Sequence, residues 1–234
     1  MVIEKVKSYF KDFSHLLYPH NCEGCGSDVL NDDAILCTKC LFELPETNFC
    51  DTKNNPVEKT FYGRLNITNA TASYYFTKDS LLQHLMIELK YRNNKNVGFY
   101  LGKQLGYQLL QAERFNDVDA LIPLPLNPKK EMKRGYNQAT IICEGIASVF
   151  QKPILKTAVI RIQFTETQTQ QDRVHRWQNM QHVFAVADKN LIEGKHVLLI
   201  DDVVTTGATL EACGNAILQV PETKLSIATV AWTI

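Results

Sequence analysis

The sequence predicts an α/β fold, a mostly parallel sheet with helices on both faces, preceded by a small cysteine-rich module. Segments with strand character alternate with segments of helical spacing from residue 71 onward, as in proteins whose parallel strands are joined by helices. The segment KHVLLIDD (195–202) is continuously apolar up to its two acids, as expected of a strand buried on both faces. Four cysteines within residues 22–40 mark the module.

The N-terminal region is expected to be separate from the α/β domain. Apolar residues recur at helical spacing over residues 1–19 and predict a short amphipathic helix, while lysines interrupt any signal-peptide core. We therefore expect a cytoplasmic protein with reduced cysteines. The polar segment 51–60 carries a proline and predicts a linker. Two domains follow, a helix with the cysteine module at 1–55 and the α/β domain at 56–234.

The α/β domain contains the following predicted elements in chain order. They are a strand at 71–77, helices at 79–92 and 97–115, a strand at 119–126, a helix at 135–151, strands at 156–162 and 195–202, a helix at 206–219, and a strand at 224–234. Ligands of such sheets bind at the carboxyl ends of the strands. Asp201 and the threonine-rich loop after it would lie there.

Composition narrows the possible partners. The chain has 234 residues with 25 Lys plus Arg and 25 Asp plus Glu, so its formal net charge is zero. This balance argues against a generally basic nucleic-acid binder and allows only a local basic face. No apolar run approaches the roughly 18–20 residues of a membrane span.

Two Cys-x-x-Cys pairs, CEGC and CTKC, predict a metal site. Their four thiolates suit one tetrahedral zinc ion, with the ligands Cys22, Cys25, Cys37 and Cys40. The alternative, a redox pair, would come once at the start of a helix. Four thiolates close the coordination shell, so the expected role is structural, and Gly26 is expected at positive φ. His20 and Cys50 are interpreted as bystanders.

The loop that follows the strand predicted at 195–202 has groups that could bind a phosphorylated sugar. Thr205, Thr206 and Thr209 offer hydroxyl groups, and Gly207 allows close approach of the backbone. Backbone N–H groups at a helix N-terminus bind phosphate. The adjacent carboxylates suit a ribose diol or a hydrated divalent metal. A phosphorylated ribose fits both halves of the loop.

The segment IDDVVTTGATL closely resembles the phosphoribosyl pyrophosphate (PRPP) loop of type I phosphoribosyltransferases. The resemblance implies that the larger domain has the fold of type I phosphoribosyltransferases. It also implies that Mg²⁺ is bound by PRPP itself. It also implies that Asp201 and Asp202 bind the ribose hydroxyls. The 5′-phosphate would lie in the turn made by Thr205, Thr206, Gly207, Ala208 and Thr209.

Further segments resemble the ComF-type (GntX-like) competence proteins, from about residue 15 to the C-terminus. IPLPLNPKKEMKRGYNQA (122–139) matches a proline-rich strand end followed by an R-G-F-N-Q-A motif, with Tyr136 in place of Phe. The spacing in RIQFTETQ and the residues after it also fits, as do the cysteine pairs. The loop at 161–179 also resembles the mobile catalytic loop of glutamine amidophosphoribosyltransferases. Many ComF-type ribbons carry further cysteines after the second pair, whereas the N-terminal region of this chain has only Cys50 there. TQQ stands where Leu and Gly often follow the loop glutamine.

The resemblance assigns further roles. Lys129, Lys130 and Arg134 would bind pyrophosphate, and the alternative is a solvated basic helix start. A lid at 161–179 would carry the catalytic charges Arg161 and Arg176, and the alternative is an ordinary surface loop. A separate group, Lys90, Tyr91 and Arg92, fits either a helix C-terminus or ligand contacts.

Two hypotheses of different class follow. The first is an enzyme that transfers phosphoribosyl from PRPP to an unknown nitrogen acceptor and is associated with DNA uptake in natural competence. Thr205 occupies the position where purine-salvage enzymes usually carry an acid, which argues against hypoxanthine or guanine as the acceptor. The second is a non-catalytic, PRPP-responsive accessory protein that binds single-stranded DNA or the competence machinery. A weaker third reading is an adaptor without activity. Turnover with any acceptor separates the first from the others.

Overall fold

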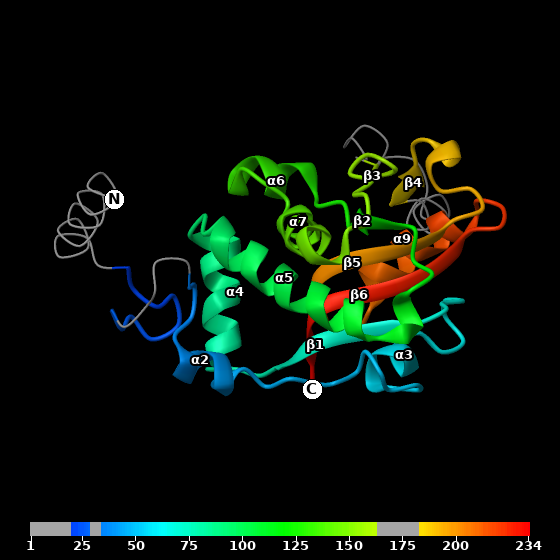
Figure 1. Cartoon of the computed structure of the whole chain (residues 1–234). Helices are drawn as coiled ribbons and strands as arrows, with labels where there is room; N and C mark the ends of the chain where they lie inside the picture. The colour runs from blue at the N-terminus through cyan, green and yellow to red at the C-terminus, as the bar shows by residue number, and fades with distance from the viewer. Residues whose placement is uncertain (1–19, 29–33, 163–182) are drawn as a thin grey trace, which may run out of the picture. The chain divides into compact units, whose positions relative to one another are not determined.

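The computed structural model describes residues 20–28, 34–162 and 183–234. The chain divides into two compact units, Met1–Pro45 and Glu46–Ile234, and each is described by itself. In the larger unit, four strands form a parallel sheet in the order β1–β6–β5–β2 (Figure 1). Their bounds are β1 Ala70–Phe76, β2 Ala120–Pro123, β5 His196–Val204 and β6 Lys224–Thr233. The fold class is therefore confirmed as α/β with a parallel sheet.

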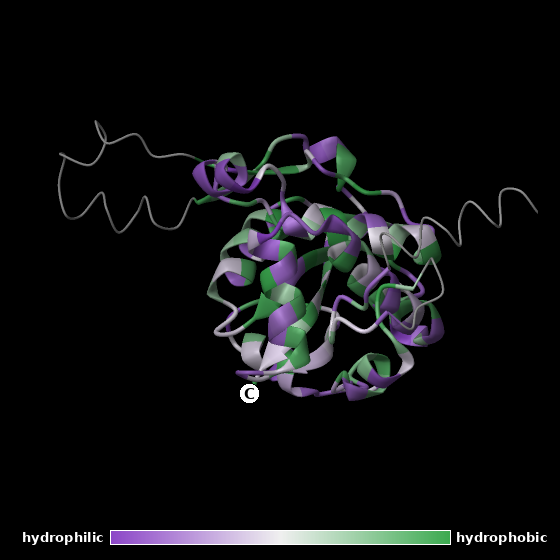
Figure 2. Ribbon diagram, turned by 90° about the vertical axis from the view of Figure 1, so that its left-hand side faces the viewer, coloured by the Kyte–Doolittle hydropathy of each residue, from purple (hydrophilic) through white to green (hydrophobic). Residues whose placement is uncertain are grey.

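Helices cover both faces of this sheet. On one face α5 (Lys95–Gln111) packs against α7 (Gln138–Phe150), with α4 (Leu81–Tyr91) beside α5. On the other face, alternate strand residues such as Val197 and Leu199 share a buried cluster with α3 (Pro56–Phe61) and α9 (Ala208–Leu218). Figure 2 shows the hydrophobic residues of this unit gathered in its interior. These layers leave the carboxyl ends of β5 and β2 next to each other.

The packing of α5 on α7 depends on glycines. A Cβ added at Gly102 would lie 2.2 Å from the carbonyl oxygen of Ile142, and one at Gly145 would lie 2.1 Å from that of Phe99. Only glycine lets the two backbones approach so closely.

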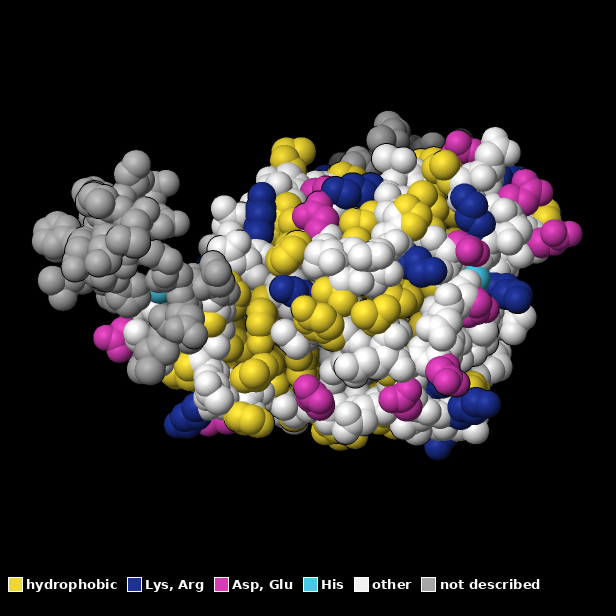
Figure 3. All heavy atoms as spheres, viewed as in Figure 1, with side chains coloured by type: hydrophobic (Ala, Val, Ile, Leu, Met, Phe, Trp, Pro, Cys, Tyr) yellow, Lys and Arg dark blue, Asp and Glu magenta, His cyan; other side chains and the backbone are white. Residues whose placement is uncertain are grey.

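On the outer surface of α4 and α5, Figure 3 shows hydrophobic side chains, and Ile87, Tyr107 and Leu110 are among those exposed.

The remaining elements refine the predicted ones. The short helices are η1 (Glu113–Phe115), α6 (Pro128–Arg134) and η4 (Lys189–Leu191), and β3 (Val159–Arg161) pairs antiparallel with β4 (Phe184–Val186). The strand predicted at 119–126 ends at Pro123. The helix predicted at 135–151 begins only at Gln138, because Gly135 ends α6 with φ of 83° and Asn137 caps α7.

The prediction of a linker at 51–60 is wrong for its second half. Asn55 caps α3 by accepting hydrogen bonds from the backbone N–H groups of Val57 and Glu58, and Val57 and Phe61 are fully buried. The amide of Asn55 also donates to the carbonyl oxygens of residues 49, 52 and 70. A polar composition concealed these contacts, because the polar groups bind the backbone of the larger unit.

The smaller unit contains α2 (Thr38–Glu43), which Cys37 caps. The helix predicted within residues 1–19 lies outside the described residues. Among the helices that the structure describes, none combines the length and the apolar character required to cross a membrane.

Candidate functional site

The acid pair lies near the end of β5. Asp201 is opposite Thr229 of β6 and is half-buried, while Asp202 is buried. The backbone N–H of Asp202 donates to Asp201 Oδ1 over 2.8 Å. The structure therefore places the two carboxylates where the sequence predicts them, at the carboxyl edge of the sheet.

Burial and the neighbouring carboxylate change the pKa of Asp201. Burial and the charge of Asp202 raise the pKa of Asp201 to about 8, while the hydrogen bond from Asp202 and the charges of Lys90 and Arg134 act in the opposite direction. Lys90 Nζ, at the end of α4, lies 2.9 Å from Asp202 Oδ2. Lys90 is therefore not only a charge at a helix C-terminus but a partner of the acid pair.

The loop after β5 encloses a small hollow. Gly207 has φ of 74° and precedes α9, so the turn requires a residue that tolerates the left-handed region. A cavity of about 60 Å³ is lined by the loop and both its flanks, namely Asp201, Val203, Val204, Thr205, Thr206, Gly207, Ala208, Thr209 and Leu210. All five loop residues predicted to bind phosphate thus line one cavity at a helix N-terminus.

A basic pocket is formed by the ends of α4 and α6. Its volume is about 500 Å³, and the described residues that line it are Lys90, Tyr91, Asn93, Lys130, Lys133 and Arg134. The three residues of α6 share one face because of their i, i+3, i+4 spacing. The Tyr91 side chain is 76% exposed, and the Arg134 guanidinium lies 5.9 Å from its ring centroid. Lys129, the third residue predicted to bind pyrophosphate, is exposed and does not line this pocket.

The motif RGYNQA anchors this pocket. The hydroxyl of Tyr136 donates to the carbonyl oxygen of Leu89, which fixes the last turn of α4 against the start of α7. Arg134 donates to Gln138 Oε1, and the amide of Asn137 donates to the carbonyl oxygen of Leu124 over 2.9 Å. Gly135, which ends α6, and Asn137, which caps α7, therefore shape the turn between these helices.

The predicted catalytic arginines are placed only in part. Arg161 ends β3, its guanidinium lies 5.2 Å from the Phe184 ring centroid, and it lines a separate hollow of about 490 Å³. That hollow and the loop cavity share none of the described residues that line them. Arg176 and most of the predicted lid lie outside the described residues.

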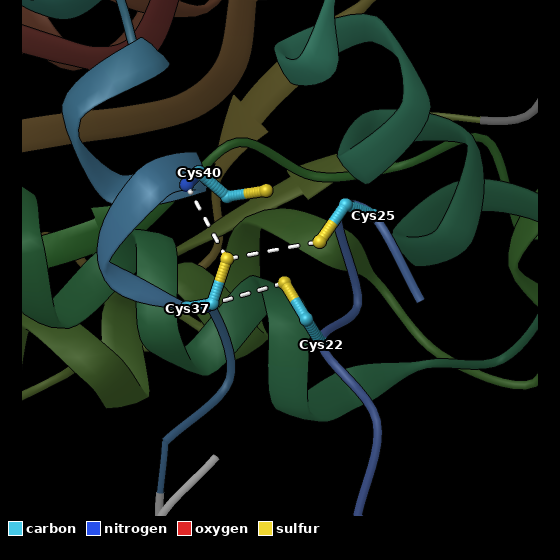
Figure 4. Close-up of side chains that lie close together, drawn as sticks. All are labelled: Cys22, Cys25, Cys37 and Cys40. Carbon is cyan, nitrogen blue, oxygen red and sulfur yellow. Dashed lines mark hydrogen bonds between the residues drawn. The ribbon is translucent and has the colours of Figure 1, made fainter. Parts of the chain in front are cut away.

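The four cysteines of the smaller unit come together. Their Sγ atoms all lie within 4.8 Å of one another, and no other group of three or more potential metal ligands occurs among the described residues (Figure 4). Cys25 Sγ and Cys37 Sγ are 3.7 Å apart, close to the edge of a tetrahedron with Zn–S bonds of about 2.3 Å, roughly 3.8 Å. The cluster therefore has the size of a four-thiolate zinc site.

Backbone geometry supports this cluster. The N–H groups of Gly24 and Cys37 donate to Cys22 Sγ over 3.4 and 3.2 Å, and Gly26 has the expected positive φ of 72°. Hydrogen bonds with Ser27 and then with Cys37 lower the pKa of Cys25 to about 6, which favours a thiolate. Cys50 lies outside the cluster and contacts Thr71 Oγ1 at 3.3 Å.

Comparison with known proteins identifies a domain in the larger unit. The family model for the phosphoribosyl transferase domain matches residues 133–231. Competence protein F of Haemophilus influenzae is 32% identical over 133 residues, which cover 55% of this chain and 58% of that protein. DNA utilization protein YhgH of Escherichia coli O157:H7 is 26% identical over 207 residues, 85% of this chain and 84% of that protein. The chain contains a phosphoribosyl transferase domain and has homologues among the competence and DNA utilization proteins.

Other relatives match shorter stretches of the chain. Competence protein ComFC of Bacillus subtilis strain 168 is 29% identical over 99 residues, 42% of this chain and 38% of that protein. Among solved structures, the glutamine PRPP amidotransferase of B. subtilis is 19% identical with a TM-score of 0.44, over 62% of this chain and 30% of that one. The relatives named here for competence thus align over less than two thirds of their own length.

Proposed function

We propose that the chain binds PRPP and transfers its phosphoribosyl group to a nitrogen acceptor with release of pyrophosphate. The arrangement of the acid pair carries this proposal. Asp201 and Asp202 lie beside the loop cavity, and the contact from Lys90 joins Asp202 to the basic pocket. PRPP carries its ribose diol between two anionic groups, the 5′-phosphate and the pyrophosphate. The protein has a matching order of groups, with the two acids between the phosphate loop and the basic pocket.

Each part of the proposed ligand has a partner of suitable chemistry. The carboxylates of Asp201 and Asp202 accept hydrogen bonds from the ribose hydroxyls. The N–H groups at the start of α9 and the hydroxyls of the loop threonines hold the 5′-phosphate. Lys130 and Arg134, with Lys129 nearby, hold the pyrophosphate. In this scheme Lys90 orients the carboxylate of Asp202 through their contact.

The proposed reaction is a substitution at C1′ of PRPP. The C1′–O bond breaks, its electron pair leaves with pyrophosphate, C1′ takes oxocarbenium character, and the nitrogen of the acceptor forms the new bond. The protein contributes position and charge rather than a covalent intermediate. We propose that Arg161 and Arg176 stabilise the departing charge.

Mg²⁺ fits this scheme as a partner of PRPP rather than of the protein. Asp202 already contacts Lys90, and the acid pair forms no group of three potential ligands among the described residues. When bound to PRPP, the ion would neutralise negative charge on the pyrophosphate. We infer that the metal held by the protein itself is one structural zinc, with the ligands Cys22, Cys25, Cys37 and Cys40, whose sulfur spacing supports this assignment.

A second candidate function is a PRPP-responsive accessory protein that binds single-stranded DNA in the cytoplasm. The exposed ring of Tyr91 among four cations favours it, because bases stack on aromatic side chains beside a basic groove. Relatives named as DNA utilization and competence proteins support the same function.

Measurement of PRPP consumption tests the proposal. The zinc-loaded protein would be incubated with Mg²⁺, PRPP and a panel of nucleobases and small amines, and pyrophosphate release would be recorded. We expect one acceptor to raise release above the rate of hydrolysis. No acceleration by any acceptor, together with single-stranded DNA binding that weakens steeply with salt, would favour the accessory function.

A further inference from the structure

Arg64 connects the segment after α3 to the phosphate loop. Its Nη1 donates to the carbonyl oxygen of Thr206 over 2.8 Å and to that of Thr60 over 3.1 Å. Its Nη2 donates to Glu211 Oε2, in the first turn of α9. One guanidinium thus holds the loop, the helix after the loop and the end of α3. Arg64 lies outside residues 133–231, the stretch that the family model matches.

The contact with Thr206 sets the direction of the next N–H group. In a trans peptide the carbonyl and the following N–H point to opposite sides of the chain. Arg64 binds the carbonyl of Thr206, so the N–H of Gly207 is directed away from Arg64. Thr60 and Phe61 pack on the α3 side of Gly207, where an added Cβ would lie 3.0 Å from Thr60 Cγ2. The opposite side of this peptide is turned away from α3, and Gly207 lines the loop cavity.

The contact with Glu211 removes an unfavourable charge. A carboxylate in the first turn of a helix lies close to the place where the helix N-terminus attracts an anion. An unpaired Glu211 would therefore repel a phosphate bound at the start of α9. Arg64 neutralises this carboxylate in a site where the two side chains are only 38% and 27% exposed.

We propose that Arg64 is a positioning residue for the phosphate loop, which aims the Gly207 N–H at the 5′-phosphate and keeps Glu211 from repelling it. This inference rests on the proposed function, in which the 201–209 loop binds the phosphorylated end of PRPP. Arg64 itself does not touch the ligand in this scheme. It acts through Thr206 and Glu211, and its loss should weaken binding of the 5′-phosphate but not of the pyrophosphate.

Titration calorimetry with two separate probes tests the inference. Ribose 5-phosphate reports on the loop, and inorganic pyrophosphate with Mg²⁺ reports on the basic pocket. For Arg64→Ala we expect a loss of about tenfold or more in affinity for ribose 5-phosphate, as for loss of a charge-assisted hydrogen bond. Pyrophosphate affinity should stay within about twofold of the wild type, which is the scatter of small context effects.

Three further variants separate positioning from simple stabilisation. Glu211→Gln in the Arg64→Ala background should restore part of the affinity, because the repelling carboxylate is gone. Arg64→Lys keeps the charge but lacks the planar fork that reaches three oxygens, so it should bind ribose 5-phosphate with intermediate affinity and preserve the fold. Lys39→Ala removes the exposed pair with Glu43 on α2 and serves as the control for loss of a surface ion pair.

The outcomes are distinguishable. Wild-type protein that binds no ribose 5-phosphate would overturn the proposed function, and the inference with it. Wild-type binding that persists unchanged in Arg64→Ala would overturn the inference alone. Equal losses of both probes, with no recovery from Glu211→Gln, would show that Arg64 stabilises the fold without positioning the loop.

Discussion

Lys90 Nζ lies 2.9 Å from Asp202 Oδ2 and thereby joins the end of α4 to the acid pair at the end of β5. The two residues are more than a hundred positions apart in the chain, and Lys90 also lines the basic pocket. One side chain therefore belongs to both halves of the candidate site. A change in the charge of Lys90 should therefore alter the pKa of Asp201.

The first prediction concerns the dependence of stability on pH. The pKa of Asp201 is raised to about 8 in the folded protein, above its ordinary value of 3.8. The folded state therefore holds a proton that the unfolded state has lost, so the contribution of Asp201 to stability is present below about pH 4 and is lost as pH rises toward 8. Chemical unfolding between pH 5 and pH 8.5 should show falling stability, and Asp201→Asn should flatten the curve. Asp51→Asn, at an exposed acid, is the control.

Lys90→Met extends this test. Lys90 acts to lower the pKa of Asp201 in the folded protein, so its removal should extend the fall in stability to higher pH, while the pH at which the fall begins stays the same. It should also destabilise the fold by roughly 3 kcal/mol or more near neutral pH, because Asp202 is then left buried and unpaired. A Lys90→Met protein with the wild-type profile would show that the contact carries little energy.

The second prediction concerns ligand binding by the acids. Asp201→Asn and Asp202→Asn keep the shape of each side chain and weaken hydrogen bonds worth about 1.5–3 kcal/mol each. Calorimetry with Mg²⁺ and PRPP at about pH 9, above the pKa of about 8 that Asp201 has in the folded protein, should therefore show at least a tenfold loss of affinity for each variant, since about 1.4 kcal/mol is tenfold. Unchanged PRPP affinity in the double variant would remove these residues from the ribose site.

The third prediction concerns the zinc cluster. The purified protein should contain one zinc per chain, and Cys37→Ser should lose it, because three thiolates and a hydroxyl hold zinc less well. Structural zinc in small peptides contributes about 10–16 kcal/mol to folding, so the smaller unit should unfold while the larger unit keeps its thermal transition. Elemental analysis measures the metal. Cys50→Ser, outside the cluster, should keep the full content.

The fourth prediction concerns Tyr136, which stands where the family motif usually has Phe. Its hydroxyl donates to the carbonyl oxygen of Leu89 in a buried contact. Tyr136→Phe leaves that carbonyl without this donor and should destabilise the protein by about 1 kcal/mol, the typical net value of one hydrogen bond. Because the contact fixes the end of α4, pyrophosphate affinity at the basic pocket should fall as well. Tyr107→Phe, on the exposed surface of α5, is the control.

The sequence predicts the parallel sheet and the loop after β5 well, because both follow from local signals. The apolar run of β5 and the order of Asp, Thr and Gly after it determine an element and its end. Lys90 and Arg64 illustrate what local patterns omit. Their partners, Asp202 and Thr206, are distant in sequence, and a lysine in the last turn of a helix has the same local explanation whether or not it binds an acid.

The prediction of a linker at 51–60 is wrong in part for a related reason. Its polar residues predict a linker, but the Asn55 amide satisfies carbonyl oxygens of residues 49, 52 and 70 within the larger unit. Buried polar groups of this kind stabilise a fold through specific partners, and composition does not record partners. The arginines of the predicted lid illustrate a different limit, since Arg176 lies outside the described residues.

The last prediction tests whether the protein catalyses transfer from PRPP. Pyrophosphate gains negative charge as the C1′–O bond breaks, so an arginine that stabilises the leaving group binds the transition state more tightly than PRPP. Arg161→Ala and Arg176→Ala should therefore lower kcat by at least about tenfold, or 1.4 kcal/mol, while PRPP affinity changes little. Single-turnover kinetics with the active acceptor would separate the two quantities. Loss of PRPP affinity with unchanged kcat would show that these arginines bind PRPP in the ground state. If both variants gave this result, Lys130 and Arg134 of the basic pocket would be the residues that stabilise the departing pyrophosphate.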